Sequence, residues 1–409
     1  MGKPIIENRV LYYPVKPLAF FSVIFILTVY LVRTSMITTT AVPLPSSPSS
    51  EPHHRRRRII KSSSSSSDED SGQYPETYLV PPTNLTTQDR INWFRSNLPA
   101  FQILKSDNLT SRFHNRARRF LLRNRCELRF FMTWISPATS FGNREFLAME
   151  SLFKSNPDGC LVLVSRSLDS RSGRGILKPL LDRGFRAAAF APDLSNLLRG
   201  TPAERWFEDM KTGEKDPGEI PLPQNLSNLV RLAVLYKYGG VYLDTDFIVM
   251  KSFRGLRNSI GAQSADSTEK WTRLNNAVLV FDKSHPLLLD FMAEFAATFD
   301  GSRWGHNGPY LVSRVVDRVG NGSSGRRNFT IMPPMAFYPA YWSKIGGYFR
   351  KPATKSDSRW VSAKLIQLSG KTFAVHLWNK ESRNFRIEEG SILWSLISRH
   401  CIICQGIYR

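Results

Sequence analysis

Two aspartates separated by one residue, Asp244 and Asp246, lie in the apolar stretch GGVYLDTDFIVM. Side chains alternate along a strand, so a strand through this stretch turns both carboxylates to one side and Thr245 to the other. Two such carboxylates repel each other and are costly to desolvate unless a cation joins them. Oxygen ligands suit hard divalent ions such as Mg²⁺ and Mn²⁺. The pair therefore predicts a divalent metal site.

A D-x-D pattern also occurs in solvated surface turns that bind no metal, and such a turn is the alternative interpretation of this pair. The apolar neighbours favour the metal site, because unpaired charge is costly among them. The preceding stretch, NLSNLVRLAVLYKYGG, has the spacing of a helix that Asn225 or Ser227 caps and Gly239 ends. Three-residue spacing places Asn228 and Arg231 on one face of that helix, directly before the aspartates.

Short apolar runs elsewhere are typical of buried strands. They are RFFMTWIS (129–136), CLVLVS (160–165) and FRAAAFAP (185–192). The first two flank REFLAMESLFKS, which has helical spacing. This alternation predicts an α/β domain with a mostly parallel sheet and a ligand site beyond the carboxyl ends of its strands. Farther on, HPLLLDFMAEFAATF predicts a helix with one buried stripe and with Asp290 and Glu294 outside it.

The N-terminal part of the 409-residue chain lacks these patterns. An uncharged run between Lys16 and Arg33, PLAFFSVIFILTVYLV, predicts a membrane segment, with a signal peptide as the alternative. Ser-, Thr- and Pro-rich sequence follows it. We therefore predict a cytoplasmic tail (1–16), a transmembrane signal anchor (17–36), a flexible stem and linker (37–124) and a single catalytic domain (125–409).

Five glycosylation sequons all follow the membrane run and favour a type II protein with its bulk in the lumen of the secretory pathway. They begin at Asn84, Asn108, Asn225, Asn321 and Asn328. In the oxidising lumen the four cysteines can form two disulfides, and three different pairings are possible. The net charge of +22 would suit nucleic acid. Since no nucleic-acid-binding module is recognisable, we predict no nucleic-acid partner. We expect the positive charge to interact with anionic lipid or with an anionic substrate.

Several long motifs resemble those of retaining glycosyltransferases that have a GT-A fold and a D-x-D motif. They run from about Glu127 to the C-terminus: FFMTWISPATSFGNREFLAMESLF, NLSNLVRLAVLYKYGGVYLDTDFIV, NNAVLVFDKSHPLLLDFM, WGHNGPYLVSRV, MPPMAFYPAYW and AVHLWN. They are most similar to the α-1,4-glycosyltransferases, a group that includes lactosylceramide 4-α-galactosyltransferase and α-1,4-N-acetylglucosaminyltransferase, and above all to its plant branch.

This resemblance implies a GT-A-type, Rossmann-like domain that transfers a hexose or N-acetylhexosamine from a UDP-sugar. The product has an α-linkage, α-1,4 by analogy, the acceptor is a glycan or glycolipid, and the expected location is the Golgi membrane. Mn²⁺ or Mg²⁺ is the implied metal. By the same resemblance Asp246 is its direct ligand, Asp244 contacts the donor and the metal shell, and His376 completes the site. A histidine packed near Trp378 is the alternative reading of His376.

The resemblance also implies residues that bind the donor. Arg231 holds the donor sugar and phosphate, and Trp134 and Ile135 lie where the family places the base, although Trp134 also suits a core position. Many relatives carry an acidic residue where this chain has Asn228, which puts one hydrogen bond to the donor sugar in question. Tyr242 is a further donor-binding candidate.

Asn276 is a catalytic candidate and His306 a donor-binding one, with a structural role in a loop as the alternative for each.

The metal ion and an arginine are expected to stabilise charge on the departing β-phosphate. Retention of the anomeric configuration requires one of two routes. Either the sugar forms a covalent intermediate with a protein carboxylate, or the acceptor attacks from the same face that the phosphate leaves. Because the sequence singles out no such carboxylate, the same-face route is favoured. A catalytically silent scaffold with the same fold is the competing functional hypothesis, and no oligomeric state is predicted.

Overall fold

The computed structural model describes residues 79–320 and 328–404. The predicted tail, the transmembrane segment and residues 37–78 of the predicted stem lie outside these ranges. Among the described residues, no helix combines the length and apolar character needed to cross a membrane.

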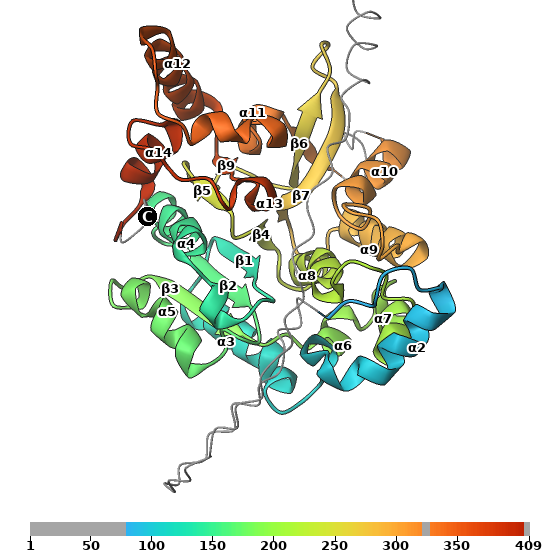
Figure 1. Ribbon diagram of the computed structural model, residues 1–409. Coiled ribbons are helices and arrows are strands. Elements are labelled where there is room, and N and C mark those ends of the chain that lie inside the picture. Colours follow the sequence, from blue (N-terminus) through green and yellow to red (C-terminus); the bar gives the residue numbers. More distant parts are fainter. Residues whose placement is uncertain (1–78, 321–327, 405–409) are drawn as a thin grey trace, which may run out of the picture. The chain divides into compact units, whose positions relative to one another are not determined.

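A seven-stranded mixed sheet runs through the described domain in the order β3-β2-β1-β4-β7-β6-β8 (Figure 1). Its strands are β1 (Arg129–Thr133), β2 (Cys160–Val164), β3 (Arg186–Phe190), β4 (Gly240–Leu243), β6 (Ser259–Ala265), β7 (Trp271–Phe281) and β8 (Thr330–Met332). The first four strands in this order are parallel, and β7 is antiparallel to both β4 and β6. The α/β class and the mostly parallel sheet are thus confirmed, and the three predicted strands are β1, β2 and β3.

Helices cover both faces of this sheet (Figure 1). Alternate residues of β1 enter different cores, because strand side chains alternate. Phe130 packs in the core that includes α4 (Asn143–Ser155) and α5 (Arg171–Leu181), whereas Phe131 packs in the core that includes α8 (Leu222–Tyr238) and α9 (Pro286–Thr298). The remaining α-helices are α2 (Thr87–Asn97), α3 (Phe113–Arg123), α6 (Leu194–Leu198), α7 (Glu204–Lys211), α10 (Pro309–Val319), α11 (Pro334–Phe337), α12 (Lys355–Lys371), α13 (Asn379–Ser382) and α14 (Ile392–His400).

The C-terminal part of the predicted stem belongs to this domain. Phe94 of α2 and Phe113 of α3 are at most 1% exposed and pack in the same core as α8. Flanking apolar residues such as Phe101 join them. The predicted boundary at residue 125 is therefore wrong, because its placement relied on the strand pattern and overlooked two helices that bury their aromatic residues against the sheet layer.

Helix α8 carries Arg231 and ends where predicted, with Gly239 following at a φ of 64°, a region that favours glycine. The predicted start is wrong. The helix begins at Leu222 with Pro223 in its first turn, a position that suits proline because its missing N–H needs no partner there. Asn225 consequently lies inside the helix, 4% exposed and hydrogen-bonded to Asn307.

The buried side chain of Asn225 has a further consequence, since this residue begins one of the five sequons. A folded chain has no room for a glycan at that position. Asn84, Asn108 and Asn328 are exposed, and the sequon at Asn321 lies outside the described residues. The two disulfides join Cys126 to Cys160 and Cys401 to Cys404.

The predicted strand through both aspartates is interrupted. Strand β4 ends at Leu243, and β5 (Phe247–Val249) begins after Asp246. Strand β5 leaves the main sheet and pairs antiparallel with β9 (Ala374–His376), so that Phe247 lies opposite His376. The segment 244–246 thus bridges two sheets, and the second sheet brings a residue from far along the sequence to the aspartates.

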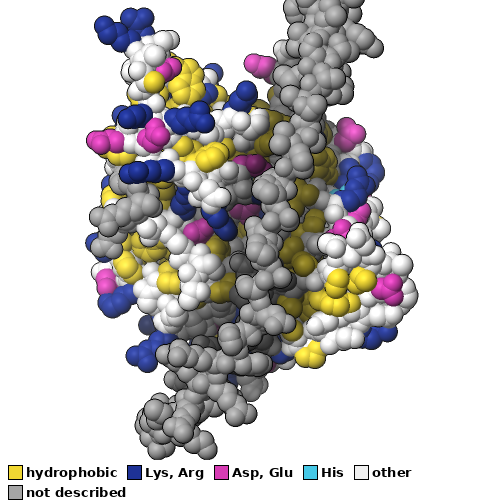
Figure 2. Space-filling view, in the orientation of Figure 1, with side chains coloured by type: hydrophobic (Ala, Val, Ile, Leu, Met, Phe, Trp, Pro, Cys, Tyr) yellow, Lys and Arg dark blue, Asp and Glu magenta, His cyan; other side chains and the backbone are white. Residues whose placement is uncertain are grey.

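Lys and Arg side chains are spread over the visible face, including the projecting helix α12 at the upper left (Figure 2). Three acidic residues are buried in the described domain, namely Glu145, Glu150 and Glu294. Glu294 of α9 was predicted to lie outside, yet it is 7% exposed because Arg314 and Arg318 of α10 bind its two oxygens at 2.8 and 3.0 Å. Its charge is compensated within the α9–α10 contact.

Replacing Glu294 by Gln is expected to destabilise the fold by about 1–2 kcal/mol, because two charge-assisted hydrogen bonds are lost. Burial alone would raise the pKa of Glu294, but the two arginines hold it below its ordinary value of 4.5. A lowered folded-state pKa stabilises the protein above the unfolded-state pKa, and this contribution disappears as pH falls through the folded-state pKa. Thermal unfolding across pH measures it: the difference between wild type and Glu294→Gln should be largest near neutrality and shrink below pH 4.5. A difference that does not change with pH would contradict this account.

Candidate active site

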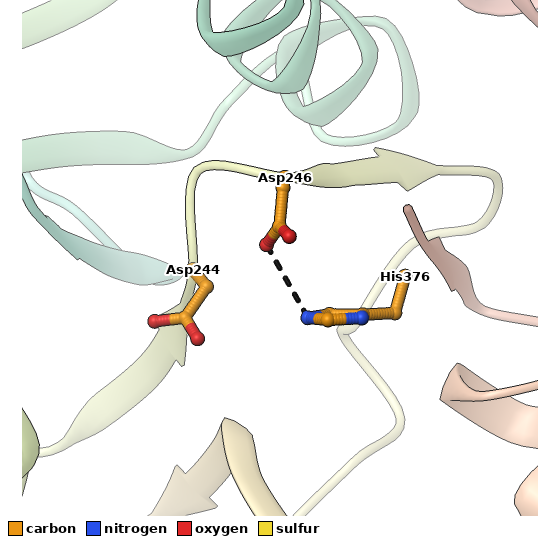
Figure 3. A group of neighbouring side chains, drawn as sticks. All are labelled: Asp244, Asp246 and His376. Carbon is orange, nitrogen blue, oxygen red and sulfur yellow. Dashed lines mark ion pairs between the residues drawn. The ribbon is translucent and has the colours of Figure 1, made fainter. Parts of the chain in front are cut away.

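Three potential metal ligands converge beyond the carboxyl end of β4 (Figure 3). Asp244 follows β4, Asp246 precedes β5, and His376 ends β9. Each offers one ligand atom, and these atoms all lie within 4.8 Å of one another. The shortest ion pair among them joins His376 Nε2 to Asp246 Oδ1 at 3.3 Å. The sequence-based expectation that both carboxylates face one side therefore holds, although a bend between two strands produces it.

Asp244 is oriented by two residues, Tyr242 and Arg231, which meet at the same carboxylate oxygen. The hydroxyl of Tyr242 donates to Oδ1 at 2.7 Å, and Arg231 Nη2 lies 3.2 Å from the same oxygen. Burial raises the pKa of Asp244; Arg231 opposes this rise and the charge of Asp246 adds to it. A cation placed between the two carboxylates would relieve both the burial cost and the repulsion.

Asp246 is held by the segment that follows β9. Its Oδ2 accepts the backbone N–H of Asn379 at 3.0 Å, and its carbonyl accepts that of Leu377 at 2.8 Å. Burial alone would raise the pKa of Asp246, but His376 and the Asn379 N–H outweigh it and lower the pKa. His376 Nδ1 accepts the N–H of Trp378 at 3.2 Å, so the other ring nitrogen, Nε2, carries a proton toward Asp246.

Arg231 is fixed at 6% exposure beside this cluster. Its guanidinium donates to the carbonyl of Asn276 at 2.9 Å and to both the carbonyl and the hydroxyl of Ser227 at 3.2 and 3.1 Å. It also lies 4.5 Å from the ring centre of Tyr242. Burial alone would lower the pKa of Arg231, but Asp244 raises it above the ordinary value, so that its charge is permanent.

A cavity of about 610 Å³ opens in front of these residues, a size typical of ligand sites. Its walls include six of the predicted site residues, namely Asn228, Arg231, Asp244, Asp246, Asn276 and His376. Asn276 Nδ2 donates to Asn228 Oδ1 at 2.9 Å. The loop before α10 approaches this amide closely, since a Cβ at Gly308 would lie 2.7 Å from Asn228 Oδ1.

A smaller cleft of about 40 Å³ lies at the carboxyl end of β1, and Trp134 and Ile135 both line it. The indole of Trp134 is nevertheless 8% exposed, donates to the Pro137 carbonyl and packs edge-on against Phe141. Trp134 therefore packs in the core and lines the cleft as well. Thr133 joins this cleft to the larger cavity, because its hydroxyl bonds those of Ser227 and Tyr242 at 2.8 and 2.7 Å.

The structure places two predicted donor-binding residues outside both cavities. Tyr242 is fully buried and acts on the site through Asp244 and Arg231. His306 bonds the carbonyl of Thr298 at 2.7 Å and faces a different pocket. Its neighbour Asn307 lines the central cavity instead. The loop residues His306 and Asn307 look equivalent in the sequence, and only the geometry of the turn separates them.

Comparisons with known proteins agree with this geometry. Residues 280–408 match the family model described as the alpha 1,4-glycosyltransferase conserved region, and residues 142–266 match the glycosyltransferase sugar-binding region containing the DXD motif. The mouse lactosylceramide 4-alpha-galactosyltransferase is 33% identical over 264 residues, covering 62% of this chain and 68% of the relative. The chain belongs to the α-1,4-glycosyltransferase family.

Two further relatives show the breadth of this family. An uncharacterized Arabidopsis thaliana protein is 32% identical over 295 residues, which cover 70% of this chain but only 44% of that protein's length. The human alpha-1,4-N-acetylglucosaminyltransferase is 26% identical over 223 residues, covering 52% of this chain and 59% of the relative.

The ligand set at this site fits a divalent metal ion. Two carboxylates and one imidazole satisfy Mn²⁺, which accepts nitrogen as well as oxygen ligands, better than Mg²⁺, which strongly prefers oxygen. Asp244, Asp246 and His376 would hold such an ion, and water or the oxygens of a ligand bound in the cavity would complete its coordination.

Three further residues, none of them predicted as a site residue, position the side chains of this site. Asn379 donates its N–H to Asp246, and Thr133 and Ser227 connect Arg231 and Tyr242 to the smaller cleft. Ser227 lies one helical turn before Arg231, so a search for side chains at four-residue spacing could have found it. The Asn379 contact is made by the backbone, and its side-chain type gives no signal.

Tyr242→Phe is expected to weaken Mn²⁺ binding by roughly tenfold, since a partner that orients a metal-ligating group typically contributes that much. Titration of the metal by calorimetry or electron paramagnetic resonance measures the effect. Tyr348→Phe is the matched control, because Tyr348 is also buried and donates its hydroxyl to the carbonyl of Pro339, away from the cavity. Equal metal affinity in the two variants would show that Tyr242 does not orient Asp244.

Proposed function

We propose that this chain is a metal-dependent, retaining glycosyltransferase that moves a hexose or N-acetylhexosamine from a UDP-sugar to a glycan or glycolipid. The bond formed is an α-linkage, α-1,4 by analogy with the names of its relatives. The observation that carries the proposal is the cluster Asp244, Asp246 and His376, whose ligand atoms lie within 4.8 Å of one another beside the permanent charge of Arg231. Carboxylates, imidazole and guanidinium together suit a metal-bound diphosphate.

The two adjoining cavities support the same reading. The larger cavity has room for the ribose, the diphosphate and the sugar, and the cleft at the carboxyl end of β1, too small at about 40 Å³ to enclose the uracil base, marks the edge against which the base would lie. Crevices beyond the carboxyl ends of parallel strands are the usual nucleotide sites of α/β sheets. When bound, the metal ion supplies positive charge that stabilises the leaving diphosphate.

The chain's own residues support the chemistry in two ways. Arg231 is fixed by Ser227 and Asn276 before any substrate enters, so it needs no rearrangement to stabilise charge on the β-phosphate. Among the described residues that line the cavity, the carboxylates are Asp244, Asp246 and Glu381. The first two belong to the metal cluster and Glu381 is exposed, which favours the same-face route over a covalent intermediate.

In that route the bond between the anomeric carbon and the β-phosphate oxygen breaks, and the acceptor hydroxyl bonds to the anomeric carbon on the same face. The hydroxyl proton passes to the departing phosphate oxygen.

We further propose that the chain is a single-pass type II protein of the Golgi membrane with its catalytic domain in the lumen. The apolar run between Lys16 and Arg33 and the exposed sequon asparagines support this location.

The deciding experiment measures UDP release by the full-length protein from a panel of UDP-sugars, with Mn²⁺ and after chelation. We expect metal-dependent release from one sugar. Asp246→Ala should lower the rate by roughly a hundredfold or more, because it removes a metal ligand. Asp158→Asn, a change at an exposed aspartate outside the cavity, should leave the rate unchanged. Full activity in Asp246→Ala would refute the proposal, and binding of UDP without turnover of any sugar would favour the silent scaffold.

A further inference from the structure

A disulfide outside the central cavity closes a short loop, residues 401–404, directly after α14. It joins Cys401 to Cys404, and α14 packs against both α4 and β5 (Figure 1). The two cysteines differ in exposure. Cys401 is 5% exposed and packs in an apolar cluster with residues of α14, whereas Cys404 is exposed. One end of this disulfide is therefore accessible from solvent, while the other end is covered.

The loop binds a buried carboxylate of α4. Glu150 is 0% exposed, and its Oε1 accepts three backbone N–H groups of the loop, those of Ile402, Ile403 and Cys404. Successive N–H groups that converge in this way form a concave anion site. No described residue binds the second oxygen, Oε2, which is buried as well. Within the described residues, all hydrogen bonds that compensate this buried carboxylate therefore come from the loop.

The backbone of Cys404 has a conformation that residues with a side chain rarely adopt. Its φ is 59°, in the left-handed region where a Cβ crowds the backbone. The disulfide and the hydrogen bond to Glu150 both hold the residue in this conformation. Once the disulfide opens, the backbone is free to relax to an ordinary φ, which moves the N–H away from the carboxylate. The disulfide thus keeps the three N–H groups directed at Glu150.

The same part of α4 supports the strand that lies beside the metal ligands. Ser151, next to Glu150, accepts the backbone N–H of Val249 in β5 at 3.0 Å, and Ser155 donates its hydroxyl to the Val249 carbonyl at 3.1 Å. Strand β5 begins directly after Asp246. A shift of α4 at Glu150 therefore reaches β5 and the carboxylate that precedes it.

We propose that the Cys401–Cys404 disulfide is a thiol–disulfide exchange site whose oxidised form docks the loop onto Glu150 and thereby supports β5. The reactant is a dithiol, which supplies the two electrons that reduce the disulfide. Its thiolate attacks the exposed Sγ of Cys404, the bond between the cysteines breaks, and its electron pair passes to Cys401 Sγ, which takes up a proton. The second thiol of the reactant then attacks the reactant's own sulfur in the mixed disulfide and releases Cys404 as a thiol. The reactant leaves as a cyclic disulfide, oxidised by two electrons.

The other disulfide of the described chain provides an internal comparison. Cys126 is 6% exposed and Cys160, the first residue of β2, is 0% exposed, and both pack in the main core. Exchange requires that a thiolate reaches a sulfur atom, so neither end of this disulfide reacts while the domain is folded. The proposed exchange is thus selective for the loop, and it does not depend on the proposed transferase function.

The first test treats the folded full-length protein with dithiothreitol, alkylates the free thiols and identifies them by peptide mass spectrometry. We expect Cys401 and Cys404 to be alkylated at least roughly tenfold faster than Cys126 and Cys160, because only the first pair has an exposed sulfur. Equal rates for the two disulfides, or no reduction of either one until the protein unfolds, would overturn the exchange site.

Hydrogen exchange measured on the same samples tests the docking of the loop. Reduction should lower the protection of the amides of residues 402–404 by at least roughly tenfold, because these N–H groups leave Glu150. The double variant Cys401→Ser with Cys404→Ser should show the same loss without any reductant. Protection that persists in both samples would overturn the role of the disulfide in docking.

Two glutamate variants separate the effect of this carboxylate from a general change in charge. Glu150→Gln should speed reduction of the loop disulfide by roughly threefold, because charge-assisted hydrogen bonds to the loop are lost. Glu388→Gln is the matched control, since Glu388 accepts the backbone N–H of Lys351 at 2.7 Å and does not contact the loop. It should leave the rate unchanged. Equal rates in the two variants would show that Glu150 does not hold the loop, and if Glu150→Gln does not fold, the hydrogen exchange of reduced wild type decides the question.

Calorimetric titration of Mn²⁺ tests the connection to β5. The double serine variant should bind Mn²⁺ roughly threefold to tenfold more weakly than oxidised wild type, as expected when the support of a metal ligand is loosened. Glu388→Gln again serves as the control. Unchanged affinity in the double variant would overturn the effect on β5, whereas absence of Mn²⁺ binding by wild type would overturn the proposed function and leave the exchange site standing.

Discussion

The repulsion between Asp244 and Asp246 is the constraint around which this domain is organised. Both carboxylates are largely withdrawn from solvent, and each has its own cationic or N–H partners: Arg231 for the first, His376 and the Asn379 N–H for the second. These partners come from α8 and from the segment around β9, so the main sheet, its crossover helix and the second sheet must all be formed before the two charges are compensated. A site with this dependence holds its geometry without a ligand, which is the preorganisation that electrostatic catalysis requires.

The interruption between β4 and β5 explains how one motif serves two sheets. A continuous strand would keep Asp246 in the main sheet, far from the residues that follow β9. The break lets β5 pair with β9, and the register that sets Phe247 opposite His376 brings the imidazole next to the preceding carboxylate. The sequence could not predict this pairing, because the two strands are short and more than a hundred residues apart. The motif resemblance identified His376, but the contact depends on a long-range register.

Short-range sequence patterns correctly predicted the elements whose formation depends on short-range interactions. The strands β1 to β3, the end of α8 at Gly239 and the buried stripe of α9 all follow from short-range spacing. The failures share a different cause. Glu294 is buried because α10 supplies two arginines, Asn225 is buried because Asn307 and the segment near Gly301 receive it, and His306 turns away because Thr298 offers a carbonyl. In each case a partner beyond the reach of local spacing, between 8 and 82 residues away, compensates a polar group that its immediate neighbours would leave in solvent.

His376 connects the metal cluster to the rim of the cavity. Its Nδ1 accepts the N–H of Trp378, a residue with the uncommon φ of 54°, and Lys380 two residues later lies over Trp304. A metal ion held through Nε2 would leave the ring proton on Nδ1, which could then no longer accept the Trp378 N–H. The residues that follow β9 therefore contact both the metal-ligand cluster and the wall of the central cavity, where Trp304 lies. A change in the side chain of His376 is expected to reach that wall through this segment.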